Sequence, residues 1–241
     1  FGFHAVMGVL ENNPARVIEI CLAGNRQDKK MQTMIQLAQQ LNLNIQSVNK
    51  NYIEQRVGNV PHQGILACCQ AREYLAEAAL TPLLTAKAGS LFLLILDGIQ
   101  DPHNLGACLR SADAAGVHAV IVPKDNSTSI TAVVEKVACG AAETVHFIQV
   151  TNLARTLRTL KDFGVWCYGL SDKAEQSFYQ AQLTGNIAII CGAEGRGIRQ
   201  NILKQCDTLY AIPMQGFVSS LNVSVAAGVC LFEALRQRQI T

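Results

Sequence analysis

From residue 91 onward, short apolar runs alternate with segments of helix length. Strands that are apolar at nearly every position are buried on both faces, and helix-length crossovers connect strands that run parallel. The pattern therefore predicts an α/β domain with a mostly parallel, doubly wound sheet covered by helices. The runs are LFLLIL at 91–96, AVIVP at 119–123, VHFIQV at 145–150, VWCYGL at 165–170, NIAIIC at 186–191 and LYAIP at 209–213.

Three loops of this region leave strand ends at unusual sequences. They begin after Leu96, Cys191 and Pro213. Because ligands of doubly wound sheets bind beyond the carboxyl ends of the strands, we expect these three loops to build the functional site.

Residues 1–72 predict a second, smaller α/β domain. Five apolar residues recur with the period of about 3.6 residues that marks one face of a helix, so this face should pack on a sheet. They are Met31, Met34, Ile35, Ala38 and Leu41. The expected elements are a helix at 3–10, a strand at 17–22, a helix at 28–41, a strand at 44–48, a short helix, and a strand at 64–69.

The stretch between the two domains is alanine-rich and is interrupted by Pro82 and Gly89. We interpret residues 73–88 as a linker and residues 89–241 as the larger domain. Residues 1–72 contain seven Lys and Arg against four Asp and Glu, whereas residues 89–241 contain twelve of each kind. This basic excess is a weak indication of an RNA partner, and an ordinary solvated surface explains it equally well.

Composition excludes several other classes of protein. No apolar run approaches the roughly 20 residues of a membrane-spanning helix, and the first residues show no signal-peptide pattern, so we expect a cytoplasmic protein without membrane contact. The nine cysteines form no CxxC pair and lie mostly in apolar segments, and the five histidines have no ligand-like spacing. We therefore expect buried, reduced thiols and no metal.

The first loop enters a helix with the sequence DGIQDPHNLGACLRSADAAG. Asn104 in this segment is either a helix cap or a catalytic group. Arg110 lies six residues later, among apolar and small residues, where a guanidinium needs an anionic partner such as a carboxylate or a phosphate.

The second loop, CGAEGRGI, follows a strand and precedes a helix that should begin near residue 199. Gly192, Gly195 and Gly197 allow positive φ and close approach of the backbone to a ligand. Their spacing differs from the dinucleotide-binding pattern G-x-G-x-x-G. Glu194 is either a turn residue or an ion-pair partner of Arg110 across neighbouring strand ends.

The third loop, IPMQGFVSSLN, leads into a helix that is apolar nearly all round. Such a helix should be buried rather than amphipathic, and a second subunit is one candidate to cover it. Any of Ser219, Ser220 and Asn222 could cap this helix, but three such residues exceed what capping requires. The apolar residues are Val223, Val225, Ala226, Ala227, Val229, Cys230 and Phe232.

Taken together, NLGACLR, GAEGRGI and IPMQGFVSSLNVSVAAGVCLFE resemble the three motifs of the SpoU (SPOUT, TrmH-like) RNA 2′-O-ribose methyltransferases, in the family's order and spacing. The resemblance covers essentially the whole chain. It implies a SPOUT-type sheet with a deep C-terminal trefoil knot, a homodimer that associates through the knotted domain, and an N-terminal RNA-binding domain similar to kink-turn-binding ribosomal proteins.

The same resemblance implies a cofactor, a substrate and a set of site residues. The cofactor is S-adenosylmethionine, and the substrate is 23S rRNA or a ribosomal precursor particle, with a guanosine of the peptidyl-transferase P loop as target. The positions matching cofactor-binding residues are Gly192, Ile212 and Leu221, with Gly197 and Met214 close by. The positions matching catalytic residues are Asn104, Arg110, Glu194, Ser220 and Asn222.

Methyl transfer from a sulfonium requires an aligned 2′-oxygen and removal of its proton. Arginine has a pKa above about 12 and is therefore a poor base at neutral pH. We assign Arg110 an electrostatic role on a phosphate or on the developing alkoxide, with Glu194 and Asn104 orienting it. The alternatives are a tRNA 2′-O-methyltransferase of the same family, a non-catalytic RNA-binding protein, and a nucleotide-dependent oxidoreductase, which the glycine spacing disfavours.

Overall fold

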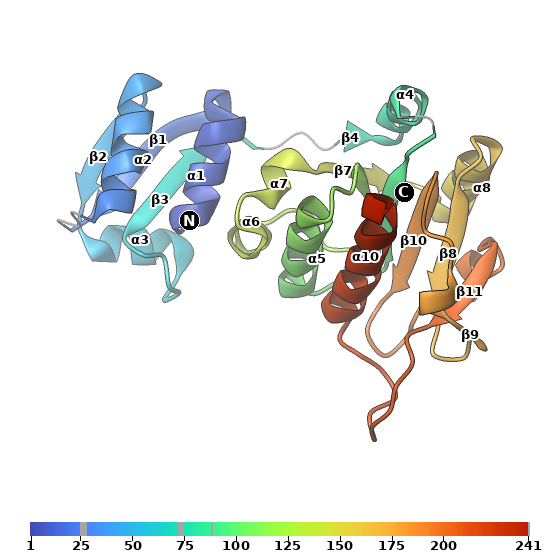
Figure 1. Cartoon of the computed structure of the whole chain (residues 1–241). Helices are drawn as coiled ribbons and strands as arrows, with labels where there is room; N and C mark the ends of the chain where they lie inside the picture. Colours follow the sequence, from blue (N-terminus) through green and yellow to red (C-terminus); the bar gives the residue numbers. More distant parts are fainter. Residues whose placement is uncertain (25–27, 72–74, 88, 241) are drawn as a thin grey trace.

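The computed structural model describes residues 1–24, 28–71, 75–87 and 89–240, which form two α/β units side by side (Figure 1). The smaller unit contains a three-stranded sheet in the order β2-β1-β3, with β1 parallel to β2 and antiparallel to β3. Its elements are α1 (Phe3–Asn12), a 3-10 turn (Pro14–Arg16), β1 (Val17–Ala23), α2 (Lys29–Gln40), β2 (Asn44–Val48), α3 (Lys50–Val57) and β3 (Ile65–Cys69).

Helix α2 has the face that the sequence predicted. Met31, Met34 and Ala38 are buried against the sheet, in a core completed by α1. The side chain of Asp28 caps the helix by accepting a hydrogen bond from the Met31 amide at 3.1 Å. The predicted 3.6-residue period therefore identified the buried face correctly.

Within the segment predicted as a linker, residues 75–87 contain regular structure. Strand β4 (Leu75–Ala76) pairs with an edge of the second sheet, and helix α4 (Leu80–Ala86) buries Leu80 and Leu84 against it. This part of the chain is therefore attached to the larger unit. A two-residue strand carries too little pattern to be recognised in a sequence.

The larger unit is an eight-stranded sheet in the order β4-β7-β6-β5-β10-β8-β11-β9, and every strand pair within the described residues is parallel. The six predicted apolar strands are all present. The trefoil knot implied by the resemblance stays a prediction. The further strands are β5 (Phe92–Asp97), β6 (Ala119–Pro123), β7 (His146–Val150), β8 (Trp166–Leu170), β9 (Gln176–Ser177), β10 (Ile187–Gly192) and β11 (Thr208–Ala211).

Helices cover both faces of this sheet, as predicted. Along β5, Phe92, Leu94 and Leu96 pack under α5 and α10, whereas Leu93 and Ile95 pack on the opposite side under α4 and α8. The alternation of side chains along a strand thus supplies two cores from one continuous apolar run. The helices are α5 (Pro102–Ala114), α6 (Ala132–Ala138), α7 (Ala141–Thr144), α8 (Leu153–Asp162), α9 (Gln200–Leu203) and α10 (Val223–Ile240).

Helix α10 is buried on one side only in the single chain. Ala227, Cys230 and Leu231 are buried in the core, but Val225 is 51% exposed and Phe232 is 49% exposed. The expectation of a helix buried all round is therefore wrong for one chain. An apolar face of α10 is left on the surface.

The cysteines carry free thiols, as predicted, and five of the nine are fully buried. Burial raises the pKa of the Cys108 thiol to about 12 and that of Cys167 to about 12. These thiols are protonated at neutral pH. Among the described residues, no helix is long and apolar enough to cross a membrane.

The end of α10 is fixed to the sheet by Arg238. Its guanidinium lies 4.7 Å from the centre of the Phe92 ring and donates hydrogen bonds to backbone carbonyl groups at the amino ends of β5 and β10. All three guanidinium nitrogens of Arg238 therefore donate hydrogen bonds. The acceptors are the carbonyl oxygens of Leu183 (3.0 Å), Ser90 (3.2 Å), Leu91 (3.1 Å) and Gly185.

Replacing Arg238 by alanine should lower the free energy of unfolding by about 2 kcal/mol, because several carbonyl groups lose a charged donor. Urea denaturation followed by circular dichroism measures this change. Arg236→Ala is the matched control, because Arg236 lies on the same helix end and pairs with Glu233, at 2.8 Å on the surface. Equal losses of stability in the two variants would contradict the assignment.

Candidate functional site

The parallel pairing of β5 with β10 brings the first two loops together. The Cα register places Asp97 at the end of β5 opposite Gly192 at the end of β10. The third loop leaves β11, which is separated from β10 by β8, and returns to α10 on the face of α5. All three loops predicted to build the site therefore meet at the carboxyl edge of the sheet.

An ion pair between a buried carboxylate and a partly exposed arginine joins the first two loops. Asp97 is 1% exposed and accepts three contacts from Arg199, which begins the helix after the glycine-rich loop. The Arg199 backbone amide donates to Oδ2 at 2.9 Å, Nε donates to Oδ1 at 2.8 Å, and Nη2 lies 2.6 Å from Oδ1. A buried carboxylate is stable only with such partners, so this pair joins the start of the first loop to the end of the second.

The glycine-rich loop is a tight turn that only glycine permits. Gly195 and Gly197 have φ of 73° and 65°, in the left-handed region. At Gly192 the constraint is space, because a Cβ there would lie 2.0 Å from the carbonyl carbon of Gly197. The turn is closed by a hydrogen bond of 2.8 Å from the Gly197 amide to the Ala193 carbonyl. The predicted positive φ is confirmed at Gly195 and Gly197, and close approach of this backbone to a ligand stays a prediction.

Asn104 is the residue at which all three loops meet. Its Nδ2 donates to Oε2 of Glu194 in the second loop at 3.5 Å. Its Oδ1 accepts from Nδ2 of Asn222 in the third loop at 3.0 Å. Asn104 is 9% exposed, so these contacts are largely shielded from water.

The capping interpretation of Asn104 is wrong. Helix α5 begins at Pro102, and Asp101 is its cap, with Oδ1 accepting from the His103 amide at 2.9 Å. Asn104 lies within the first turn of the helix, and its amide is free to bridge the loops. The predicted capping role of Asn222 is confirmed, since its Oδ1 accepts from the Ser224 amide at 2.9 Å at the start of α10.

The predicted ion pair between Arg110 and Glu194 is also wrong. Among the described residues, no carboxylate lies within ion-pair distance of Arg110. Six residues separate Arg110 from Asn104, which is about 9 Å along a helix axis. Arg110 is exposed and donates from Nη1 to the sulfur of Cys139, at 3.5 Å, in the turn between α6 and α7.

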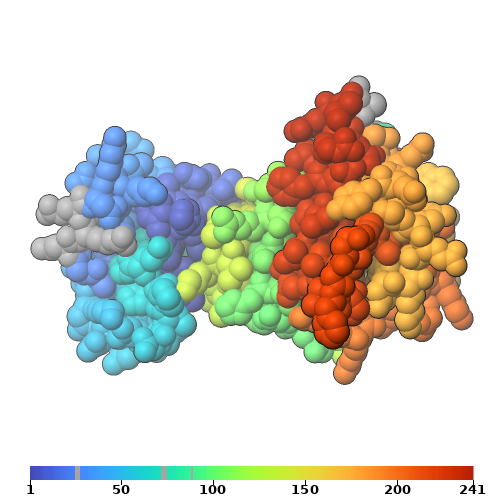
Figure 2. All heavy atoms as spheres, turned by 60° about the horizontal axis from the view of Figure 1, so that its bottom comes forward, coloured from blue at the N-terminus to red at the C-terminus, as the bar shows by residue number. Residues whose placement is uncertain are grey.

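The remaining predicted residues lie along the third loop. Ile212 packs against the core, Met214 and Leu221 are half-buried, and Ser220 is exposed. The loop projects from the sheet edge in Figure 1, and Figure 2, in which this side comes forward, shows it on the surface beside α10. The third loop therefore carries both apolar and polar groups at the carboxyl edge of the sheet.

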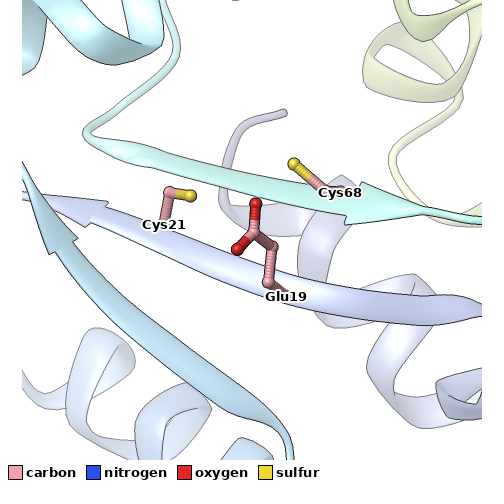
Figure 3. Close-up of side chains that lie close together, drawn as sticks. All are labelled: Glu19, Cys21 and Cys68. Atoms are coloured by element: carbon pink, nitrogen blue, oxygen red, sulfur yellow. The ribbon is translucent and has the colours of Figure 1, made fainter.

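A second group of chemically active side chains lies in the smaller unit. Donor atoms of Glu19 and Cys21 on β1 and of Cys68 on β3 lie within 4.8 Å of one another (Figure 3). Burial, followed by the hydrogen bond to Glu19, raises the pKa of Cys68 to about 11. Glu19 also accepts from Nε2 of Gln46 at 2.9 Å. The carboxylate is thus already satisfied by hydrogen bonds, and the absence of a metal requirement stays a prediction.

Sequence reasoning missed three residues that build or border the site, namely Asp97, Arg199 and Cys139. A signal existed for Asp97, because a carboxylate directly after a fully apolar strand is buried and needs a cation. No spacing rule connects it to Arg199, which is 102 residues away. Cys139 carried no signal beyond its position in an apolar segment.

Comparison with known proteins agrees with this geometry. Residues 91–232 match the SpoU rRNA Methylase family, and residues 1–75 match the family described as RNA 2'-O ribose methyltransferase substrate binding. The chain is 54% identical over 239 residues to the 23S rRNA (guanosine-2'-O-)-methyltransferase RlmB of Shewanella oneidensis, covering 99% of this chain and 97% of that protein. It is 50% identical over 238 residues to RlmB of Escherichia coli K12, covering 99% and 98%.

Solved structures share the fold. The SpoU methyltransferase AviRb from Streptomyces viridochromogenes, in complex with the cofactor AdoMet, superposes with a TM-score of 0.81 at 19% identity, covering 100% of this chain and 90% of that one. With two family matches that together span most of the chain and relatives at half identity over its whole length, this chain belongs to the SpoU rRNA methylase family.

Proposed function

We propose that this protein transfers a methyl group from S-adenosylmethionine to the ribose 2′-hydroxyl of a guanosine in 23S rRNA, in the peptidyl-transferase P loop. The observation that carries the proposal is the convergence of three distant segments on Asn104, which bonds Glu194 on one side and Asn222 on the other. Relatives that match this chain over nearly its whole length are named for this reaction on 23S rRNA.

The residues of the second and third loops fit the cofactor. At Gly192 the backbone of the turn occupies the space of a side chain, so the loop presents main-chain groups at the sheet edge. Half-buried Met214 and Leu221, with Ile212 packed on the core, supply apolar surface for an adenine ring. Gly197 completes the turn with a left-handed backbone.

The cofactor supplies an activated methyl group, so the protein has to position the ribose and manage one proton and one negative charge. Arg110 keeps its positive charge and stabilises a substrate phosphate or the developing alkoxide. Asn104 and Glu194, fixed to each other, orient the ribose beside it. Ser220 and Asn222 shape the pocket from the third loop.

The smaller unit supplies affinity for RNA in this proposal, and the substrate is 23S rRNA or a precursor particle in the bacterial cytoplasm. Two copies of the chain associate through α10. The support is the exposed apolar surface formed by Val225 and Phe232 on α10 and by Phe217 and Val218 on the loop before it. A surface of this kind is typical of a contact between subunits.

Transfer of a labelled methyl group from S-adenosylmethionine tests the proposal directly. Purified protein should label a 23S rRNA fragment containing the P loop, and alkaline hydrolysis should stop at one guanosine there. A bulk tRNA substrate, assayed in parallel, should stay unlabelled. Label on tRNA alone would favour the tRNA enzyme, and RNA binding without any label would favour a non-catalytic protein.

Arg110→Lys should lower kcat at least a hundredfold although the charge is kept, because a point charge cannot replace a planar fork of donors. Affinity for S-adenosylmethionine, measured by calorimetry, should stay within twofold of wild type. Arg196→Lys, which changes an exposed arginine of the second loop, is the control and should keep its activity. Near wild-type turnover of the Arg110 variant would remove Arg110 from the mechanism.

Gly192→Ala should abolish binding of S-adenosylmethionine while the protein stays folded. The added Cβ would lie 2.0 Å from the Gly197 backbone, so the turn has to open. Calorimetry measures the affinity, and thermal unfolding verifies the fold. Gly228→Ala controls for a general effect of losing a glycine, because Gly228 lies in α10 and a Cβ there would meet the Ser111 hydroxyl at an ordinary 3.7 Å. Unchanged affinity in the Gly192 variant would show that the turn does not hold the cofactor.

A further inference from the structure

The turn between α6 and α7 lies between the two units of the molecule. It consists of Cys139 and Gly140, with φ of 52° and 97°. On one side α6 and α7 contact α5, the helix that carries Asn104 and Arg110, and on the other side they contact α1 of the smaller unit. Figure 1 shows α6 and α7 in this intermediate position.

The smaller unit is attached to this turn by close backbone packing and by charge. A Cβ at Gly8 of α1 would lie 2.5 Å from the Cα of Gly140, so the two backbones touch. Arg16 Nη1 lies 2.6 Å from Oε1 of Glu143, whose side chain is only 5% exposed. Asn13 Nδ2 donates to the other oxygen of Glu143 at 2.6 Å. Burial lowers the pKa of Arg16, but the charge of Glu143, its hydrogen bond and the charge of Glu135 outweigh burial, so the pKa is raised overall.

The opposite side of the turn holds Arg110. The sulfur of Cys139 accepts the hydrogen bond from Arg110 Nη1 at 3.5 Å, while its thiol donates to the Lys136 carbonyl at 3.6 Å. The helix before the turn packs closely on α5, because a Cβ at Gly106 of α5 would lie 2.9 Å from the Val134 carbonyl oxygen in α6. The sulfur is therefore held at a fixed place relative to the guanidinium.

The conformation of Cys139 indicates that its side chain has a use. Left-handed backbone at the end of a helix is ordinarily occupied by glycine, because a Cβ there costs about 1 kcal/mol. Cys139 adopts φ of 52° with a side chain in place, and that side chain contacts Arg110. Glycine at this position would fit the backbone better but would leave the guanidinium without its partner.

We propose that the α6–α7 turn is the element through which the smaller unit positions Arg110, with Cys139 as the positioning residue. This inference rests on the role of Arg110 in the proposed function. Docking of the smaller unit, through Arg16 and Glu143, fixes the turn, and the turn fixes the guanidinium. When the smaller unit binds RNA, the same contact holds the Arg110 guanidinium in the orientation that the reaction requires.

The first test compares two substitutions of Cys139. Cys139→Gly relieves the left-handed backbone and removes the acceptor, so thermal stability should be kept while kcat at saturating RNA and cofactor falls about tenfold. Cys139→Ser keeps an acceptor and should retain at least half of the wild-type kcat. Affinity for S-adenosylmethionine should be unchanged in both. A Cys139→Gly variant with wild-type kcat would overturn the proposal.

Arg110→Ala, assayed in parallel, separates this inference from the proposed function. If Arg110→Ala is fully active, the role of Arg110 in the proposed function is wrong. If Arg110→Ala is inactive and Cys139→Gly is fully active, Arg110 acts without positioning by the turn, and only the present inference fails.

The second test addresses the contact between the units. Arg16→Ala should lower the single-turnover rate at saturating RNA about fivefold, with RNA affinity within twofold of wild type. Lys50→Ala is the matched control, because it removes the same charge from the same unit at an exposed pair with Glu54, away from the contact. It should leave the saturated rate unchanged. A loss of RNA affinity in Arg16→Ala with an unchanged saturated rate would make Arg16 an RNA ligand and overturn the coupling.

Discussion

The parallel pairing of β5 with β10 is the constraint on which the site depends. It places Asp97 opposite Gly192, so that two loops separated by about ninety positions leave the sheet side by side. The buried Asp97 carboxylate then requires a cation, and Arg199 at the far end of the glycine-rich loop provides it. One ion pair thus fixes the start of the first loop and the end of the second.

The hydrogen bonds of Asn104 extend this arrangement to the third loop. An amide side chain presents a donor and an acceptor on opposite sides, so one residue can join two partners that do not touch each other. The Asn104 amide nitrogen donates to Glu194, and its amide oxygen accepts from Asn222. Because Asn222 also caps α10, the position of the site is coupled to the helix whose far end Arg238 fixes to the sheet.

Most of the fold could be predicted from the sequence because long apolar strands and a 3.6-residue helix period are local signals. The strands β4 and β9 have two residues each, and their pairing depends on neighbours that no local pattern specifies. The three loops of the site were predictable because ligands of parallel sheets bind beyond the carboxyl ends of the strands. The partners within them were not. An ion pair with Arg110 was one of two interpretations of Glu194, but Glu194 bonds Asn104, which lies about 9 Å from Arg110 along the axis of α5.

The partner that Arg110 does have agrees with an electrostatic role. A carboxylate within ion-pair distance would neutralise the guanidinium and compete with an anionic substrate for its donors. The Cys139 sulfur is a weak acceptor, so it orients one nitrogen of Arg110 and leaves the charge and the other donors available. Because the Glu194 carboxylate bonds Asn104 instead, the Arg110 guanidinium remains available to bind a phosphate or an alkoxide. Both the weak sulfur acceptor and the lack of a carboxylate partner among the described residues therefore suit Arg110 to bind an anionic substrate.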